Sequence, residues 1–178
     1  MDFMKTFLRL TGIILCLLVW LHAELPLGEI PPVLNLDGKL GGRVDGTSWS
    51  SSEIKGKVWI LFYADPDESE LNNEASEAIK AMEFPKDKYG SIAIVNMAAT
   101  WKPNFAINII LKKKQERYED TIYVRDYKKT VVDKWGLADD SNDVVLFDQE
   151  GRVLFSRDGQ LTPEEIKLVI KLIQDNLG

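Results

Sequence analysis

Cysteine and histidine are almost missing from this sequence. Each occurs once among 178 residues, as Cys16 and His22, and neither occurs again later in the chain. A protein without them has no dithiol for redox exchange, no thiol nucleophile, no histidine base and no zinc ligands of the Cys/His type. Removal of the first 23 residues would therefore exclude all four kinds of chemistry from the rest of the protein.

The first 23 residues have the pattern of a secretory signal. Lys5 and Arg9 precede a short apolar run, LTGIILCLLVWLHA, which ends in the small residue Ala23. The run is shorter than the about 20 apolar residues that span a membrane, and its charged start and small last residue are typical of a cleaved signal peptide. We expect residues 1–23 to be a signal peptide and residues 24–178 to be the mature protein. An uncleaved membrane anchor is the alternative.

The size and charge of the remaining chain limit its partners. Residues 24–178 are enough for one domain with a substantial core. The whole chain has 28 acidic and 22 basic residues and a formal net charge of −6, which becomes one unit more negative without residues 1–23. An acidic domain gains nothing from the phosphate attraction that drives nucleic-acid binding. We expect no nucleic-acid partner, and no membrane contact after signal cleavage.

Residues 57–82 have the pattern of a strand followed directly by a helix. The segment KVWILFYA, residues 57–64, is short, apolar and rich in aromatic and β-branched residues, as buried strands are. Asp65 as the N-cap, Pro66 as the first helical residue and Glu68 as the N3 acid predict that a helix starts there. Its expected apolar face consists of Leu71, Ala75, Ala78, Ile79 and Met82.

The rest of the chain continues the alternation of strands and helices. Glycine- and serine-rich residues 27–56 predict short edge strands, and DVVLFDQEGRVLFSRDG predicts a hairpin that turns at Gly151. Further strands are expected at 91–98 and 121–126, and helices at 104–118, at 129–137 and from Thr162 onward. This order is that of thioredoxin. We therefore expect a thioredoxin-like α/β domain, with a central mixed β-sheet and helices on both faces.

Three segments resemble the YtfJ family of small exported bacterial proteins. They are AIKAMEFPKDKYGSIAIVN, VVDKWGL and GRVLFSRDGQLTPEEI, of which the last is the most specific, and the likeness covers most of residues 24–178. The family is similar to thioredoxin in fold and is exported to the periplasm. The resemblance therefore implies that fold and a periplasmic location, and it implies no defined biochemical activity.

Both parts of a thioredoxin redox site are missing. The turn after the first long strand reads FYADPDESE, with Asp67 and Glu70 in the places of the two cysteines. Redox-active members also carry a proline just before the strand VVLF, and this chain has none between Leu137 and Val144. We therefore expect neither a disulfide exchanger nor a peroxidase and, without cysteine or histidine after residue 23, no enzyme, with catalysis by carboxylates as the open alternative.

Two acidic loops are expected to meet at one edge of the sheet. This acidic edge consists of Asp65, Asp67, Glu68, Glu70, Asp139, Asp140 and Asp143. Calcium, which takes several hard oxygen ligands in flexible geometry, would use Asp67, Asp140 and Asp143. A pair of carboxylates could instead act as acid and base if one pKa were raised. Helix capping and solvated loops explain the same residues without a ligand, and we expect no resident cofactor.

The helix expected at 104–118 carries more apolar surface than one buried stripe requires. Phe105 and Ile109 lie on a different face from its expected core residues, and Trp101 precedes them. These three residues are the candidate partner surface, a patch for another protein of the periplasm, unless a loop or the amino-terminal segment covers it. The leading hypothesis is a non-redox interaction module. The sequence does not define its partner or its oligomeric state.

Overall fold

The structure, a computed structural model, describes residues 24–178, so the predicted signal peptide lies outside the described residues. The strands are β1 (Asn35–Leu36), β2 (Gly41–Arg43), β3 (Trp49–Ser50), β4 (Val58–Ala64), β5 (Tyr89–Asn96), β6 (Thr121–Asp126), β7 (Asn142–Phe147) and β8 (Val153–Arg157). The helices are α1 (Asn73–Lys80), α2 (Asn104–Arg117), α3 (Thr130–Trp135) and α4 (Pro163–Asn176), and a 3-10 turn, η1, spans Ser51–Glu53. None of these helices is both long and apolar enough to cross a membrane.

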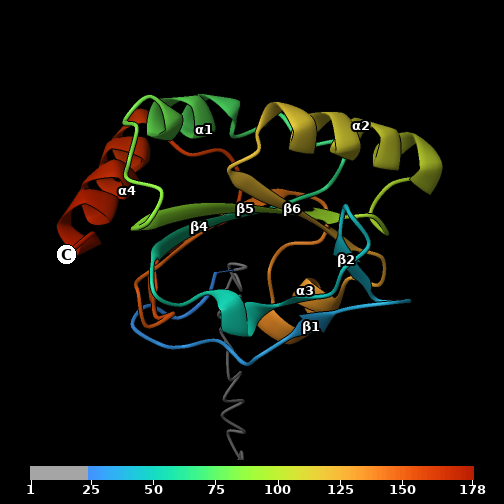
Figure 1. Cartoon of the computed structure of the whole chain (residues 1–178), viewed down its shortest axis with the longest axis horizontal. Helices are drawn as coiled ribbons and strands as arrows, with labels where there is room; N and C mark the ends of the chain where they lie inside the picture. The colour runs from blue at the N-terminus through green and yellow to red at the C-terminus, as the bar shows by residue number, and fades with distance from the viewer. Residues whose placement is uncertain (1–23) are drawn as a thin grey trace, which may run out of the picture.

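Six strands form a mixed sheet in the order β2-β6-β5-β4-β7-β8, and β1 pairs with β3 beside it. The central strand β4 runs parallel to β5 and antiparallel to β7. Helices α1, α2 and α4 lie over one face of the sheet, and α3 lies on the other face with β1 (Figure 1). The chain therefore has the predicted α/β architecture, with helices on both faces of a mixed sheet.

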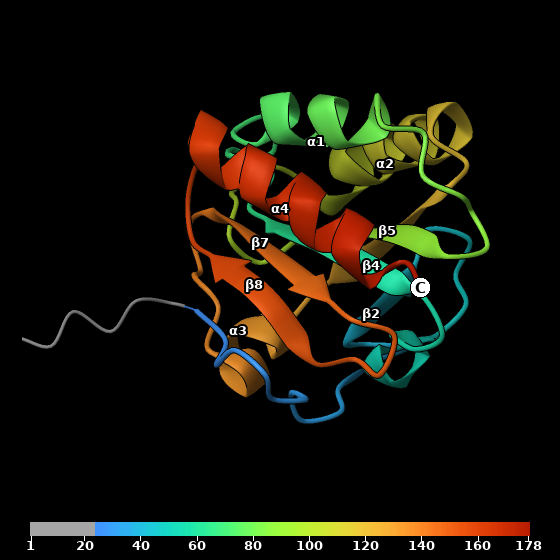
Figure 2. The same ribbon diagram turned by 90° about the vertical axis from the view of Figure 1, so that its left-hand side faces the viewer.

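Alternate residues of the central strands bury in two separate cores. On the α3 side, Leu61 and Tyr63 of β4 pack with Trp135 and Phe147, whose rings lie 6.0 Å apart. On the other side, Ile60 packs with residues of α1 and α4. The segment that starts at Glu24 runs along the α3 side (Figure 2). Because both faces of the central sheet are covered, the strands read as continuous apolar runs in the sequence.

The helix predicted directly after Asp65 starts eight residues later, at Asn73. Between them the chain forms successive turns: the backbone N–H of Asp67 donates to the Asp65 carboxylate at 2.7 Å, and that of Leu71 donates to the Glu68 carbonyl at 3.1 Å. The Asp65 side chain thus stabilises a turn and does not cap a helix. The prediction was wrong about the start because the same residue types favour both structures, whereas Ala75 and Ile79 do bury as expected.

The carboxy-terminal half agrees with its sequence pattern. The Thr162 hydroxyl accepts the Glu165 backbone N–H at 3.2 Å, and the Glu165 carboxylate accepts the Thr162 N–H at 2.8 Å, which is the predicted capping box. Gly151 turns the β7–β8 hairpin at a φ of 86°, where a side chain would also meet the Ile54 carbonyl. Local signals of this kind are reliable because both partners lie within a few residues.

Candidate functional site

The two acidic loops meet, as predicted, at the ends of neighbouring strands. Ala64, the last residue of β4, pairs with Asn142, the first residue of β7. The next backbone N–H, that of Asp65, donates to the carbonyl of Ser141 at 2.8 Å. The backbone therefore places the acidic edge where the thioredoxin order requires it, and its chemistry depends on where each carboxylate points.

Asp67, at the place of a thioredoxin cysteine, turns toward the loop before α2. Its carboxylate forms an ion pair with Lys102 and accepts the Thr100 hydroxyl at 2.7 Å. These hydrogen bonds, from Lys102 first and Thr100 second, lower the pKa of Asp67 below its usual value. Asp67 is therefore a compensated anion that fastens the first loop to residues 100–102.

On the other loop, Asp139 is neutralised in the same way and Asp143 points elsewhere. The Asp139 carboxylate pairs with Lys129 and accepts the Asn96 side-chain amide at 2.9 Å. Asp143 is 0% exposed, and its Oδ1 atom accepts the Ala138 backbone N–H at 3.3 Å. Burial, followed by the carboxylates of Asp158 and Glu24, raises the pKa of Asp143 to about 8.

The seven carboxylates therefore do not converge on one point. Asp65 is buried in its own turn, where burial raises its pKa, while Glu68, Glu70 and Asp140 are exposed. Within residues 24–178 no group of three or more acidic side chains is placed to hold a metal ion. The geometry offers no ligand set from Asp67, Asp140 and Asp143. Cation binding remains a prediction that solution measurements must test.

A pair of buried amides, Asn72 and Asn142, joins the loops instead, through a contact that the sequence did not predict. The Asn72 side-chain amide donates to the Gly159 carbonyl at 3.0 Å, and its oxygen accepts the Leu161 N–H at 2.9 Å. The same Asn72 amide donates to the Asn142 side chain at 3.2 Å, and Asn142 donates to the Glu68 carbonyl at 3.1 Å. The only sequence signal would have been that Asn142 opens a strand, because asparagine is mostly exposed in proteins.

The candidate partner surface lies on the outer side of α2. Trp101 is 86% exposed, Phe105 69% and Ile109 53%, whereas Ile107 and Leu111 are buried against the sheet. Phe105 and Ile109 are four residues apart, so they form one stripe that faces away from the core. The amino-terminal segment from residue 24 packs on the opposite face of the sheet and does not cover this stripe.

A broad groove separates α1 from α2 on the same face. It has a volume of about 1580 Å³, and its walls include Ile79 of α1 and Ile110 of α2, with Phe62 and Ala93 of the sheet between them. It forms because α1 has only eight residues and leaves part of the sheet uncovered. Lysines and acidic residues both line it, so the groove does not select a ligand class by charge.

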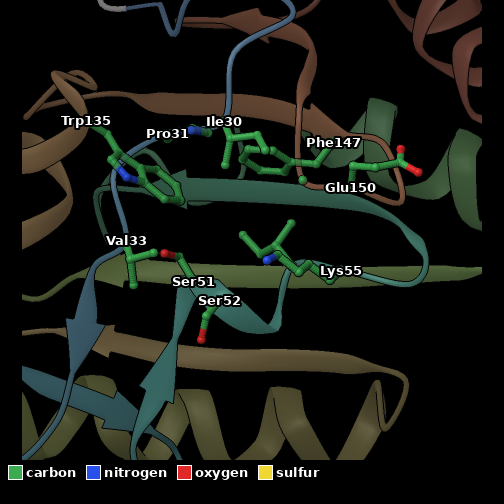
Figure 3. Close-up of a pocket in the computed structure, with 11 residues that line it drawn as sticks. Ile30, Pro31, Val33, Ser51, Ser52, Lys55, Trp135, Phe147 and Glu150 are labelled. Atoms are coloured by element: carbon green, nitrogen blue, oxygen red, sulfur yellow. The ribbon is translucent and has the colours of Figure 1, made fainter.

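A second hollow lies under the amino-terminal segment on the α3 side. Its volume is only about 60 Å³, far below the roughly 300–1,000 Å³ of ordinary small-molecule sites. Trp135 and Phe147 border it, and the carboxylate of Glu150 points away from it (Figure 3). It can hold water and no organic substrate. Asp143, whose pKa burial raises strongly, lines neither hollow.

The sequence of this chain matches a family of bacterial proteins. Residues 37–176 match the family described as "Bacterial protein of unknown function (YtfJ_HI0045)". The chain is also 30% identical over 178 residues to "Uncharacterized protein YtfJ" of Escherichia coli strain K12, which covers 96% of this chain and 97% of the relative. The match extends over nearly the full length of both proteins.

Solved structures similar to this chain are thioredoxin-like. One is the pneumococcal exposed lipoprotein thioredoxin of Streptococcus pneumoniae, with a TM-score of 0.56 and 17% identity over 79% of this chain and 99% of that one. Another is the thioredoxin domain of a thiol-disulfide oxidoreductase of Bacteroides vulgatus, with a TM-score of 0.58 and 17% identity over 86% and 99%. At this identity the likeness establishes the fold alone.

Proposed function

The chain belongs to the YtfJ family, and from this premise we propose that it is an exported thioredoxin-fold protein that works in the periplasm as a non-redox interaction module. The observation that carries the proposal is the exposed stripe formed by Trp101, in the loop before α2, and by Phe105 and Ile109 on α2. Large aromatic residues at exposed positions are typical of interface centres, where they supply much of the binding energy.

The loss of redox chemistry is supported by what occupies its place. No cysteine follows residue 16, and Asp67 stands where a thioredoxin has one. Its ion pair with Lys102 and its hydrogen bond with Thr100 hold the first loop against the loop that carries Trp101. The position that holds a redox cysteine in thioredoxin thus helps to fix the loop of Trp101, which belongs to the candidate partner surface.

The charges beside the stripe define the chemistry of the partner. Lys112 and Lys113 follow Ile109 by three and four residues, so they lie on the next turn of α2 in line with the stripe. Lys114 and Arg117 add positive charge to the last turn. We infer a protein partner that presents an apolar patch flanked by carboxylates, because opposite charges around an apolar centre favour association.

The export part of the proposal is supported by the sequence pattern at residues 1–23. A charged start, a short apolar core and Ala23 before Glu24 fit cleavage between these two residues. The acidic balance of the chain and its lack of later cysteines are both compatible with a periplasmic address. Detection of the chain in the periplasmic fraction, with Glu24 as its first residue, tests this part.

The experiment that tests the interaction places a photo-crosslinking amino acid at Phe105 in the full-length chain expressed in a bacterium. Leu168 on α4, which is 46% exposed, is the matched control because it also lies on a helix over the same face of the sheet. We expect one dominant crosslinked protein from position 105 and none from position 168. Equal crosslinking at both positions would overturn the proposal.

The crosslinked protein is then purified and titrated directly. We expect Phe105→Glu to weaken its binding at least tenfold and Leu168→Glu to leave it unchanged. Vesicles that contain anionic lipid are a third arm of the titration, because aromatic residues beside lysines also bind membrane surfaces. Binding to vesicles with no effect of Phe105→Glu on the protein partner would replace an interaction module with a membrane-surface one.

A further inference from the structure

Asp143 of β7 and Asp158, the residue that follows β8, each have a buried carboxylate oxygen without a hydrogen-bond partner among residues 24–178. Val144 of β7 pairs with Arg157 of β8, and the same register continued by one residue sets Asp143 opposite Asp158. Both residues lie on the α3 side of the sheet, because side chains alternate along a strand. The Oδ2 atom of Asp143 and the Oδ1 atom of Asp158 are buried, and within residues 24–178 neither accepts a hydrogen bond.

No described cation neutralises this pair. Arg157, which precedes Asp158 in the chain, pairs with Glu24 and with Glu165, each at 3.2 Å, and Lys129 pairs with Asp139. Among residues 24–178 no ion pair includes Asp143 or Asp158. An uncompensated buried carboxylate is strongly destabilising, and Asp143 is 0% exposed, so a missing positive partner would explain why the sequence keeps an acid at this position.

The amino-terminal segment passes beside the same point. The Gly28 N–H donates to the Val153 carbonyl at 2.8 Å, and the Leu25 N–H donates to the Ser156 hydroxyl at 2.8 Å, so this segment runs antiparallel to β8. Continued by one residue, the same register sets Glu24 opposite Arg157, the last residue of β8, whose guanidinium pairs with the Glu24 carboxylate at 3.2 Å. Asp158 is the next residue along the chain. Figure 2 shows the start of the described chain at this end of β8.

We propose that signal cleavage after Ala23 supplies the missing cation, with the new α-ammonium group of Glu24 docking on Asp143 and Asp158. In the uncleaved chain the Glu24 nitrogen is a neutral amide. Hydrolysis adds hydroxyl to the Ala23 carbonyl carbon and hydrogen to the Glu24 nitrogen, which takes up a further proton at neutral pH. The inference rests on the export part of the proposed function and goes beyond it, because it gives the cleavage a role in stability.

The proposal predicts opposite pH behaviour for the two forms. The groups beside Asp143 are Tyr63, its partner in the β4–β7 register, and the carboxylates of Asp158 and Glu24, and none of them is a cation. With the amide at Glu24, the folded protein holds a proton on Asp143 that the unfolded chain releases above about pH 4. Stability then falls as pH rises from about 4 to 8. With the ammonium group, Asp143 is ionised throughout, and this fall disappears.

The test compares two forms of the full-length chain, each secreted and purified from the periplasm. One is the natural chain, and the other has two glycines inserted between Ala23 and Glu24, which moves the new amine by about 7 Å. Intact mass identifies the first residue of each form. Melting at pH 5, 6, 7 and 8 then measures the pH dependence. We expect the natural form to be nearly flat, and the extended form to lose about 5 °C or more across this range.

The substitution Asp143→Asn connects the effect to the proposed partner. In the extended form it should remove the pH dependence, and in the natural form it should abolish the advantage over the extended form. If Asp143→Asn fails to fold, the pKa of the Glu24 amine, measured by NMR after ¹³C-methylation, is the second readout. We expect it above the usual α-amine value of about 7.7–8.0. An unshifted value would overturn the proposal.

The possible failures are distinguishable. A protein that retains residues 1–23, or that begins elsewhere than Glu24, overturns both the export part of the proposed function and this inference. A protein that begins at Glu24 but shows the same pH profile as the extended form overturns this inference alone. Neither result affects the crosslinking at Phe105, which tests the interaction surface independently.

Discussion

Helices α2 and α4 have the same length of 14 residues and lie over the same face of the sheet, but they use their apolar residues differently. In α4 a capping box starts the helix, and Ile166, Val169 and Ile173 are buried. In α2 no side chain caps the start, and apolar residues lie both under and outside the helix. The apolar residues of α4 therefore contribute to the stability of the fold, whereas some of those on α2 are exposed and contribute little to it.

The largest expected difference between the two helices is in the stability cost of removing one apolar side chain from each. Ile173→Ala in α4 removes a side chain that is 0% exposed, and we expect it to lower the free energy of unfolding by about 2–5 kcal/mol. Ile109→Ala in α2 should change it by less than about 0.5 kcal/mol, because its side chain faces solvent. Urea unfolding of both variants measures the difference. A large effect of Ile109→Ala would mean that the stripe is covered in solution.

The second test concerns binding rather than stability. Trp101→Ala should weaken the purified crosslinked partner's binding by about 2 kcal/mol, or roughly thirtyfold, as expected for an exposed aromatic residue at an interface centre. Leu168→Ala on α4 should leave binding unchanged, and neither variant should alter the melting temperature by more than about 2 °C. Isothermal titration of the two variants makes the comparison. Equal losses from both would place the interface elsewhere.

The third test concerns the capping box, which α4 has and α2 lacks. Thr162→Ala abolishes the capping box of α4 and should cost about 1 kcal/mol. The pKa of the Glu165 carboxyl is lowered first by the backbone N–H of residue 162, which alanine keeps, and also by the Thr162 hydroxyl, which donates to it at 2.9 Å and which alanine removes. The part of the cost that comes from this hydroxyl bond is present above the unfolded pKa and is lost as pH falls through the lower folded one. Melting at pH 7 and pH 3 measures both effects. A cost that is the same at both pH values would mean that the hydroxyl bond to the Glu165 carboxylate contributes nothing, and no cost at either pH would contradict the capping role.

The smallest expected effect is that of calcium on the loop beside α2. Calcium would have to displace Lys102 from Asp67, and that ion pair holds the loop that carries Trp101. We expect millimolar Ca²⁺, compared with chelator at fixed ionic strength, to move the melting temperature by less than about 1 °C. A shift of about 5 °C or more, lost in Asp67→Asn, would restore the calcium site, since saturating ligand stabilises a fold by about 2.7 kcal/mol.

Most of the fold was predictable, and the error at α1 shows the limit. The start of α4 is determined by Thr162 and Glu165, which are three residues apart and meet in any helix that begins there. The start of α1 depends on Asn72, whose partners Asn142 and Leu161 are far away in the chain. No local pattern contains those contacts, so Asp65 and Pro66 were assigned to a helix when they form a turn.

The candidate site divides in the same way. The order of strands and helices was enough to predict that the two acidic loops lie close together, because Ala64 and Asn142 are at the ends of neighbouring strands. The direction of each carboxylate was not predictable. Asp67 turns to Lys102 on one side of the sheet, and Asp143 lies buried on the other, since a residue's face depends on the strand register.

The sequence by itself determined the strand and helix order, the capping of α4 and the absence of thiol and histidine chemistry after residue 23. These follow from composition and from interactions between near neighbours. Only the tertiary structure decided that the acidic edge does not converge, that Trp101 and Phe105 stay exposed, and that Asp143 lies opposite Asp158 with no ion-pair partner among residues 24–178. Those outcomes depend on which distant segments pack against each side chain, and burial and charge compensation are properties of that packing.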